Sequence, residues 1–189
     1  MATVAFAEQG VAATSLDELA RRLGVTKQTI LYHFRSKDGL VAAVLQAAAQ
    51  DLVAVLDEAS RASAPGWDRV EATVRSAFAL AVRRPELLGL LRELSRLDPE
   101  RTAPVRELLQ PMVNAAVAEL EAGMAAGRYR PSDPRLLLVS AYAAVTGVVN
   151  DAEILRAVQL ELDVRVAARL RATVLAFLRA ALVPGDPPR

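Results

Sequence analysis

The sequence predicts an all-α protein with a short N-terminal group of helices and a longer helical bundle after it. Alanine and unbranched side chains dominate the composition, and such residues lose little conformational freedom in a helix. Apolar residues recur at helical spacing, most clearly between residues 37 and 62. No stretch alternates apolar and polar residues for long enough to indicate a strand.

Turn and cap signals place the individual helices. Ser15 followed by Glu18 is a capping-box pattern that starts a short helix, and Gly24 ends that helix. Thr26 and Ser36 can cap the next two helices. In chain order, the expected helices cover about residues 2–9, 15–24, 27–34, 37–62, 67–83, 86–97, 103–126, 134–157 and 162–182.

Two of these segments have unusual features. Pro111 should kink or divide the helix that contains it, because proline lacks the N–H donor. Residues 136–149 are apolar nearly all round, which indicates a helix buried on more than one side. We expect helices 134–157 and 162–182 to pair with their counterparts in a second copy, as an isologous four-helix interface. The alternative is that they close a monomeric core.

The composition excludes several classes of protein. The 189 residues are 53% hydrophobic and 24% charged, which is typical of a globular chain. The formal net charge is only +1, so a nucleic-acid surface would have to be local. Without cysteine and with a single histidine, disulfides and thiolate or multi-histidine metal sites are excluded. We therefore expect no metal and no cofactor. Since neither a signal peptide nor an uncharged run of bilayer length is present, we expect a cytoplasmic protein.

Residues 15–34 have the spacing of a helix-turn-helix. Ala20, Gly24 and Ile30 are separated by four and six residues. Ala20 is small enough for the second helix to cross close to it, and Gly24 takes a turn conformation that a Cβ would oppose. Ile30 then fills the gap between the two helices.

Four residues of the second helix point outward on the surface that a recognition helix lays in the major groove: Lys27, Gln28, Thr29 and Tyr32. Lys27 can reach a guanine edge or a phosphate, and Gln28 can bond an adenine bidentately. Thr29 offers a hydroxyl and a methyl group, and Tyr32 offers a phenol to phosphate.

Two further residues flank this surface. Lys37 lies at the start of the long helix, where free amides and the positive end of the helix dipole would make a phosphate clamp with it. His33, between two aromatic residues, is more typical of a structural hydrogen-bonding group than of an acid, a base or a ligand. On pattern alone, a generic helical hairpin with an Ala/Gly turn is the alternative to a DNA-binding unit.

The segment SLDELARRLGVTKQTILYHFRSKDGLVAAVL resembles the DNA-binding domain of the TetR family of bacterial transcriptional regulators, from about Phe6 to Leu45. The combination of G-V-T-K, Y-H-F and S-K-D-G-L at these spacings carries the resemblance. It implies an all-α homodimer with a DNA-binding domain at residues 1–45 and a helical domain at residues 46–189 that binds a small molecule and dimerises. The implied partners are a palindromic double-stranded operator and a small-molecule effector.

The resemblance also assigns residues. The family's recognition-helix positions correspond to Lys27, Gln28, Thr29 and Tyr32. Positions where backbone contacts or local support are usual correspond to Thr26, His33 and Lys37. Leu31 stands where the family usually has tyrosine, and ATVAFAEQG is similar to only the second half of the family's first helix. Residues 1–45 contain five Lys and Arg against four Asp and Glu, so we expect weak nonspecific binding with a shallow salt dependence.

The effector site is expected among the middle helices. Candidate lining residues are Trp67, Phe78, Met112, Asn114, Tyr142 and Thr146. Taken singly, most apolar residues at helical spacing belong to a core, whereas polar groups on apolar stretches need partners when buried. Because few charges are available there, the expected effector is largely apolar or neutral.

Catalysis is not expected. The single histidine and the lack of cysteine exclude most nucleophile–base arrangements, and the paired carboxylates at 17–18 and 57–58 fit solvated helix faces. The leading interpretation is a homodimeric repressor that a small effector releases from its operator. The alternative is a helical small-molecule-binding or adaptor protein with a weakened DNA-binding unit. Neither interpretation involves a membrane.

Overall fold

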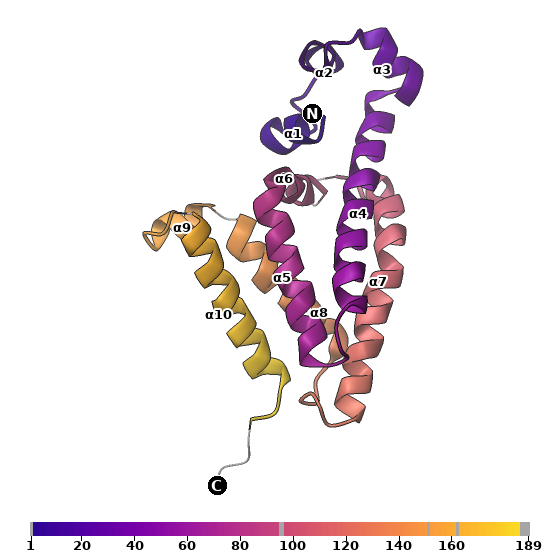
Figure 1. Ribbon diagram of the computed structural model, residues 1–189. Coiled ribbons are helices and arrows are strands. Elements are labelled where there is room, and N and C mark those ends of the chain that lie inside the picture. Colours follow the sequence, from indigo (N-terminus) through magenta and orange to yellow (C-terminus); the bar gives the residue numbers. More distant parts are fainter. Residues whose placement is uncertain (1, 95–96, 151, 162, 186–189) are drawn as a thin grey trace. The chain divides into compact units, whose positions relative to one another are not determined.

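The computed structural model describes residues 2–94, 97–150, 152–161 and 163–185, in which ten helices and no strand occur (Figure 1). The helices are α1 (Ala2–Gln9), α2 (Leu16–Leu23), α3 (Lys27–Phe34), α4 (Lys37–Arg61), α5 (Trp67–Arg83), α6 (Pro85–Leu94), α7 (Pro99–Ala125), α8 (Pro134–Asn150), α9 (Ala152–Ala157) and α10 (Val164–Leu182). The all-α prediction is confirmed. Residues 151 and 162, which the expected C-terminal helices include, lie outside the described residues.

Side-chain caps explain where the short N-terminal helices begin and end. The Oγ of Ser15 accepts a hydrogen bond from the Glu18 N–H at 3.1 Å. The Oγ1 of Thr26 accepts one from the Thr29 N–H at 3.1 Å. Gly24 has φ 67° and ψ 28°, the left-handed conformation that ends α2 without the steric cost of a Cβ. The caps predicted from the sequence are therefore formed.

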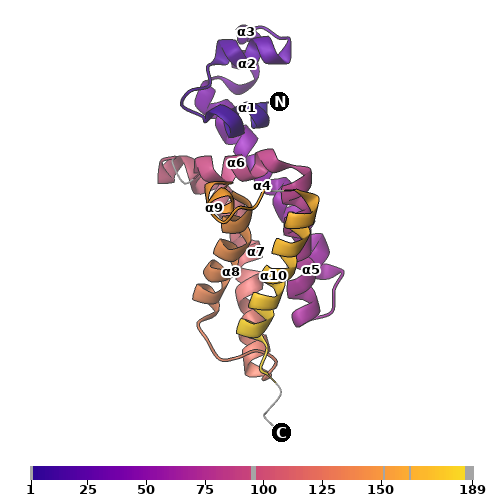
Figure 2. The ribbon, with the colours of Figure 1, turned by 90° about the vertical axis from the view of Figure 1, so that its left-hand side faces the viewer.

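The chain divides into two compact units, one made of residues up to Leu52 with Arg84–Leu109 and the other of Val53–Arg83 with residues from Gln110 onward. In the first unit, α1 packs on α6 (Figure 2). The approach is close enough to require glycine, because a Cβ on Gly89 would lie 2.6 Å from the Cβ of Ala7. Phe6, Leu19 and Ile30 are buried in this unit, so the predicted core role of Ile30 is confirmed.

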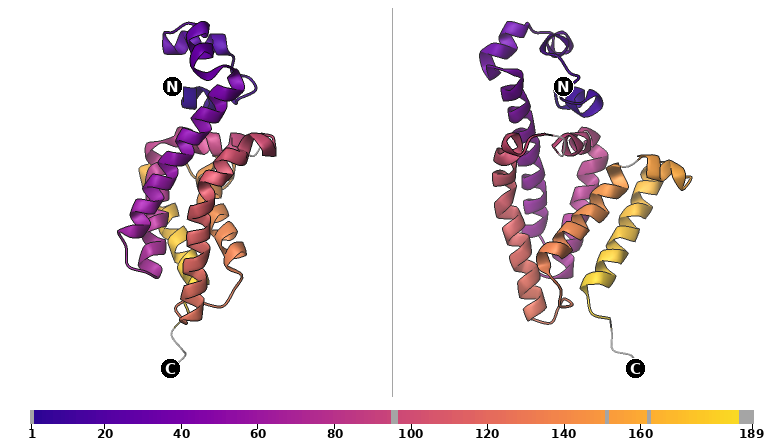
Figure 3. Two further views of the ribbon diagram at one scale, coloured as in Figure 1. Left: turned by 90° about the vertical axis from the view of Figure 1, so that its right-hand side faces the viewer. Right: turned by 180° about the vertical axis from the view of Figure 1, so that it is seen from behind.

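Among the described residues of the second unit, two apolar clusters stand out. In one, Val74 and Phe78 of α5 meet Val174, Leu175 and Leu178 of α10. One face of α8 packs against this cluster through Ala141, Ala144 and Val145, and α8 and α10 run side by side (Figure 3). The other cluster consists of Leu120, Tyr129 and Leu182. Trp67 packs against both clusters.

Two long helices differ from simple expectation. α7 is one uninterrupted helix of 27 residues, so the predicted division at Pro111 is wrong. A proline removes one N–H donor but leaves the hydrogen bonds of the flanking turns, and Pro111 is exposed.

α4 is the one described helix long and apolar enough to cross a membrane, with a mean hydropathy of 1.8 over its most apolar window. Core helices meet the same criterion, and α4 buries Leu40, Val41 and Leu45.

Candidate nucleic-acid interface

Short helices α2 and α3 hold the predicted recognition residues on an open surface. Ile30 is 4% exposed and anchors α3, whereas Gln28 and Thr29 are exposed and Tyr32 is 84% exposed. Thr26 and Thr29 share a hydrogen bond between their hydroxyl groups at 2.9 Å, in addition to the cap. These contacts orient Thr29, while Gln28 and Tyr32 are left free to reach a ligand outside the chain.

Lys27 begins α3 and is already paired within the protein. Its Nζ donates to Asp17 Oδ2 at 2.8 Å, which connects the first turns of α2 and α3. Both side chains are largely exposed, so the ion pair adds little to stability. The carboxylate of Asp17 does, however, place a negative charge beside Lys27, a residue predicted to contact DNA. Sequence reasoning treated Asp17 as a solvated carboxylate and missed this contact; opposite charges in the first turns of the two helices were the available signal.

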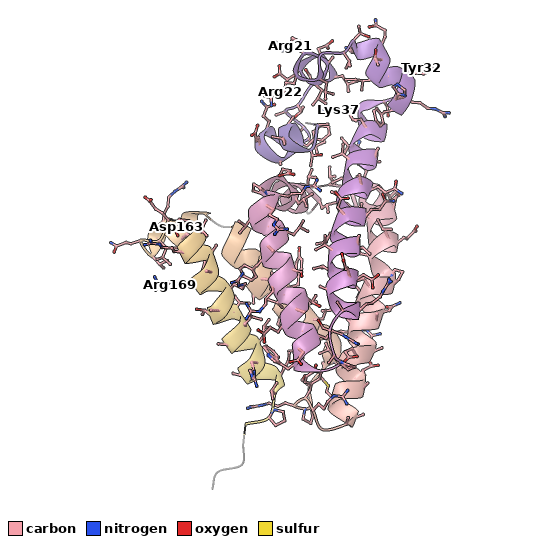
Figure 4. All side chains as sticks on the ribbon, viewed as in Figure 1. Arg21, Arg22, Tyr32, Lys37, Asp163 and Arg169 are labelled. Atoms are coloured by element: carbon pink, nitrogen blue, oxygen red, sulfur yellow. The ribbon has the colours of Figure 1, made fainter. Side chains whose placement is uncertain are left out.

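Lys37 is likewise engaged. Its Nζ donates to the carbonyl oxygen of Ala12 at 3.2 Å, and in Figure 4 the side chain lies on the side of α4 that faces the α1–α2 loop. A lysine ammonium has three donors, so one bond to Ala12 leaves two for a phosphate. The contact therefore orients the predicted clamp residue without occupying it fully.

The two arginines of α2 share a carboxylate. Arg22 donates to Glu18 at 2.9 Å, and Arg21 also pairs with Glu18. Both arginines are labelled in Figure 4. The hydrogen bond from Arg22 and the charge of Arg21 hold the pKa of Glu18 below its ordinary value. Arg22 also lies 3.7 Å from Glu8 of α1. These pairs reduce the positive charge that α2 presents.

His33 is exposed and lies between aromatic neighbours. Its ring makes an edge contact with Tyr32, with centroids 5.2 Å apart, and is tilted against Phe34 at 6.3 Å. His33 lies on the same helix as the recognition residues, and these ring contacts are compatible with the expected supporting role.

The six predicted effector residues lie in the second unit, in different environments. Phe78 is buried in the α5–α10 cluster, and Trp67 packs beside it. The Trp67 Nε1–H donates to Glu71 at 2.9 Å, and Arg179 lies 5.5 Å above its ring. Trp67 and Phe78 thus belong to one cluster with ordinary core contacts.

The other four candidates are half-buried or exposed. Met112 is half-buried, and Asn114 is exposed and accepts a hydrogen bond from Gln110 at 2.9 Å. Tyr142 is 56% exposed, and the Thr146 hydroxyl donates to the Tyr142 carbonyl oxygen at 2.8 Å. The two clusters described above include Trp67 and Phe78 but none of these four residues.

The fold and this surface define a helix-turn-helix protein with a helical C-terminal region. Residues 2–44 match the family model described as "Bacterial regulatory proteins, tetR family". Residues 2–44 therefore match a family of regulatory proteins and not of enzymes. The predicted resemblance and the expectation of a non-catalytic protein are confirmed by this assignment.

The chain is also similar to a curated relative and to solved structures that share its fold. The transcriptional activator FasR of Mycolicibacterium smegmatis is 28% identical over 153 residues, which cover 79% of this chain and 70% of FasR. AibR, solved with isovaleryl coenzyme A and operator DNA, has a TM-score of 0.80 at 19% identity, with 94% of this chain and 93% of that chain covered. FadR of Bacillus subtilis, solved with stearoyl-CoA, has a TM-score of 0.77 at 18% identity, with the same coverage.

Proposed function

We propose that the protein is a cytoplasmic, homodimeric repressor that binds a palindromic operator and is released by a largely apolar effector. Residues 1–45 would form the DNA-binding domain, and residues 46–189 would bind the effector and dimerise. The observation that carries the DNA-binding part is the open face of α3, where Gln28 and Tyr32 are exposed while Ile30 anchors the helix. The match of residues 2–44 to the TetR family model supports the same assignment.

Within this proposal the surface residues have separate roles. Gln28 and Lys27 read base edges in the major groove, and Thr29 adds a hydroxyl and a methyl group. Tyr32 and Lys37 contact phosphates. Thr26 holds the N-terminus of α3, and His33 supports the outer end of the helix.

The dimer proposal is supported by a second face of α8. Its inner face packs on α5 and α10, whereas Leu136, Val139 and Tyr142 at helical spacing are each more than half exposed. Phe177 of α10 is also 60% exposed. Exposed large apolar residues on two neighbouring helices are the surface that a second copy would cover, as in an isologous four-helix interface.

The effector proposal rests on the composition of the helical domain and on two solved proteins that share its fold. AibR and FadR of Bacillus subtilis share the fold and were solved with acyl coenzyme A thioesters. We extend that ligand class to this chain, with the acyl part held in the helical domain among the candidate residues Trp67, Phe78, Met112, Asn114, Tyr142 and Thr146. An acyl chain needs an apolar lining with few hydrogen bonds, which matches the composition of the domain.

Helix α4 offers the connection between effector and operator, because it contributes residues to both units and begins directly after the recognition helix. A dimer sets its recognition helices about 34 Å apart to match one turn of DNA. In the proposed mechanism, the effector binds more tightly to a conformation in which α4 has a different position. Operator affinity then falls by the difference between the effector's binding free energies for the two conformations.

Fluorescence anisotropy tests the proposal. A labelled duplex from the DNA that flanks the gene is titrated with the protein at several salt concentrations, with unlabelled mixed-sequence DNA as competitor. Specific, salt-dependent binding is expected, and acyl coenzyme A thioesters of increasing chain length should release the DNA. A folded dimer that shows no preference for this duplex would favour the adaptor alternative, which the internal pairing of Lys27 and Lys37 supports.

A further inference from the structure

The cations of the helix-turn-helix segment differ in whether they have a partner inside the protein. The segment matched to the family model contains five lysines and arginines. Four of them make hydrogen bonds or ion pairs within the chain: Arg21, Arg22, Lys27 and Lys37. Arg35 is different, because its exposed guanidinium has no partner among the residues that the structure describes.

Arg35 also has an unusual backbone. It lies between α3 and α4 with φ 63° and ψ −34°, and its N–H donates to the Leu31 carbonyl oxygen at 2.8 Å. The N–H of Ser36 donates to the Phe34 carbonyl oxygen at 2.7 Å. Together these features make a γ-turn with positive φ, a rare and strained conformation for a residue that has a Cβ.

A glycine would adopt this backbone at no steric cost, but the chain has arginine here. Strain of this kind persists at functional positions when the side chain or the geometry is needed. The position suits a contact with DNA, because Arg35 follows the last residue of the recognition helix and comes two residues before Lys37.

We propose that Arg35 is a phosphate anchor of the DNA-binding surface, with its guanidinium donating hydrogen bonds to phosphate oxygens of the operator backbone. Arginine presents planar donors that match phosphate bidentately. Because Arg35 has no internal partner in the described chain, it binds phosphate without first breaking an ion pair, unlike Lys27. This inference rests on the proposed function, since it concerns the same DNA surface.

Three substitutions at one position separate charge from strain. Arg35→Lys keeps the charge and the strain, Arg35→Ala removes the charge but keeps the strain, and Arg35→Gly removes both. Arg106→Ala, on the exposed surface of α7 outside the helix-turn-helix, is the control for the loss of one positive charge. Each variant of the full chain is measured by anisotropy on the gene-flanking duplex and on a mixed-sequence duplex, and by thermal unfolding.

Arg35→Ala and Arg35→Gly should bind both duplexes more weakly. The salt slope, which is the steepness with which log affinity falls with log salt concentration, should be lower by about 0.9. The ratio of wild-type to variant affinity should therefore shrink by about 3.5-fold between about 50 and 200 mM salt. Arg35→Gly should at the same time raise the Tm by about 2–4 °C as the positive-φ strain is relieved. Arg35→Lys should retain most of the affinity, and Arg106→Ala should leave the salt slope unchanged.

Unchanged affinity in Arg35→Ala and Arg35→Gly would overturn the inference, as would weaker binding without a change in salt slope, because that pattern marks a structural role. A higher Tm for Arg35→Gly would show that this variant is folded, so misfolding could not be the cause of its weaker binding. If the wild-type protein itself shows no salt-dependent DNA binding, the proposed function fails, and the phosphate anchor fails with it.

Discussion

Tyr129 is the largest fully buried side chain among the described residues, and its hydroxyl has no hydrogen-bond partner there. A Cβ on Gly123 would overlap the Tyr129 ring, so the glycine allows the ring to pack on α7. Burying an unpartnered hydroxyl costs free energy that phenylalanine avoids. We expect Tyr129→Phe to leave the free energy of unfolding unchanged or to raise it by about 1 kcal/mol, as measured by urea denaturation.

The same tyrosine predicts a loss of stability at high pH. Burial, and then the charge of Glu119, raise the pKa of Tyr129 above its ordinary value of 10.0. The unfolded phenol therefore ionises at a lower pH than the folded one. The contribution of this group is fully present below about pH 10 and is lost as the pH rises through the raised folded pKa.

Denaturation measured at several pH values should thus show a steeper alkaline loss in the wild-type protein than in Tyr129→Phe. Tyr32→Phe, at a tyrosine that is 84% exposed and outside the proposed dimer face, is the matched control and should follow the wild type. Identical alkaline profiles for wild type and Tyr129→Phe would contradict the described burial of the phenol.

Gln28 and Lys37 should differ in what they contribute to DNA binding. Gln28→Ala is expected to relax base preference at one operator position, at a cost of about 1–3 kcal/mol, because an amide reads a base edge. Lys37→Ala is expected to weaken all sequences alike and to lower the salt slope by about one. Anisotropy with single-base operator variants distinguishes the two effects. Equal behaviour of both variants would contradict the division of roles.

At the scale of elements, the junction between α3 and α4 requires a glycine in the first turn of α4. A Cβ on Gly39 would overlap the Phe34 carbonyl oxygen, which is a backbone atom and cannot rotate away. In most helices, Gly→Ala stabilises by roughly 0.5–1 kcal/mol. Gly39→Ala should instead destabilise the fold by about 1–3 kcal/mol, measured by denaturation. A gain in stability would contradict this close approach.

Helix boundaries could be predicted because their causes are local. Ser15, Thr26 and Gly24 act on backbone groups within a few residues, so the sequence indicates α2 and α3 directly. The predicted division of the helix at Pro111 is wrong, because one missing N–H donor leaves the hydrogen bonds of the flanking turns in place and α7 continues through the proline.

The partners of the candidate DNA-binding residues could not be predicted in the same way. The recognition residues follow from helical periodicity and from family resemblance. The bond from Lys37 to Ala12 joins residues 25 apart, and the pair of Lys27 with Asp17 depends on how two helices cross. The positive φ of Arg35 leaves no mark in the sequence, because the residue is not glycine or asparagine.

At the scale of the whole molecule, the proposed dimer depends on the outward face of α8. Val139 is 63% exposed, so Val139→Glu leaves the folded chain intact but places a charge in the proposed interface. We expect a monomer in light scattering, and a loss of operator affinity of about 10²–10⁴-fold because the two half-sites are no longer bound together.

Val82→Glu is the matched control for this dimer test. Val82 lies on α5, is 52% exposed and has the same side chain as Val139, but it is outside the proposed interface. It should remain dimeric with operator affinity near that of the wild type. A dimeric Val139→Glu variant with normal affinity would contradict the assignment of α8.

The ion pairs on α2 and α3 have a consequence for how such a regulator searches a genome. Arg21, Arg22 and Lys27 each have a carboxylate partner before any DNA arrives. Such counter-ions weaken long-range attraction to phosphate, which lowers the rate of capture by random sequence and shortens residence there. A larger share of the molecules then diffuses free of the chromosome. An effector meets those free molecules directly, so induction does not have to wait for release from nonspecific DNA.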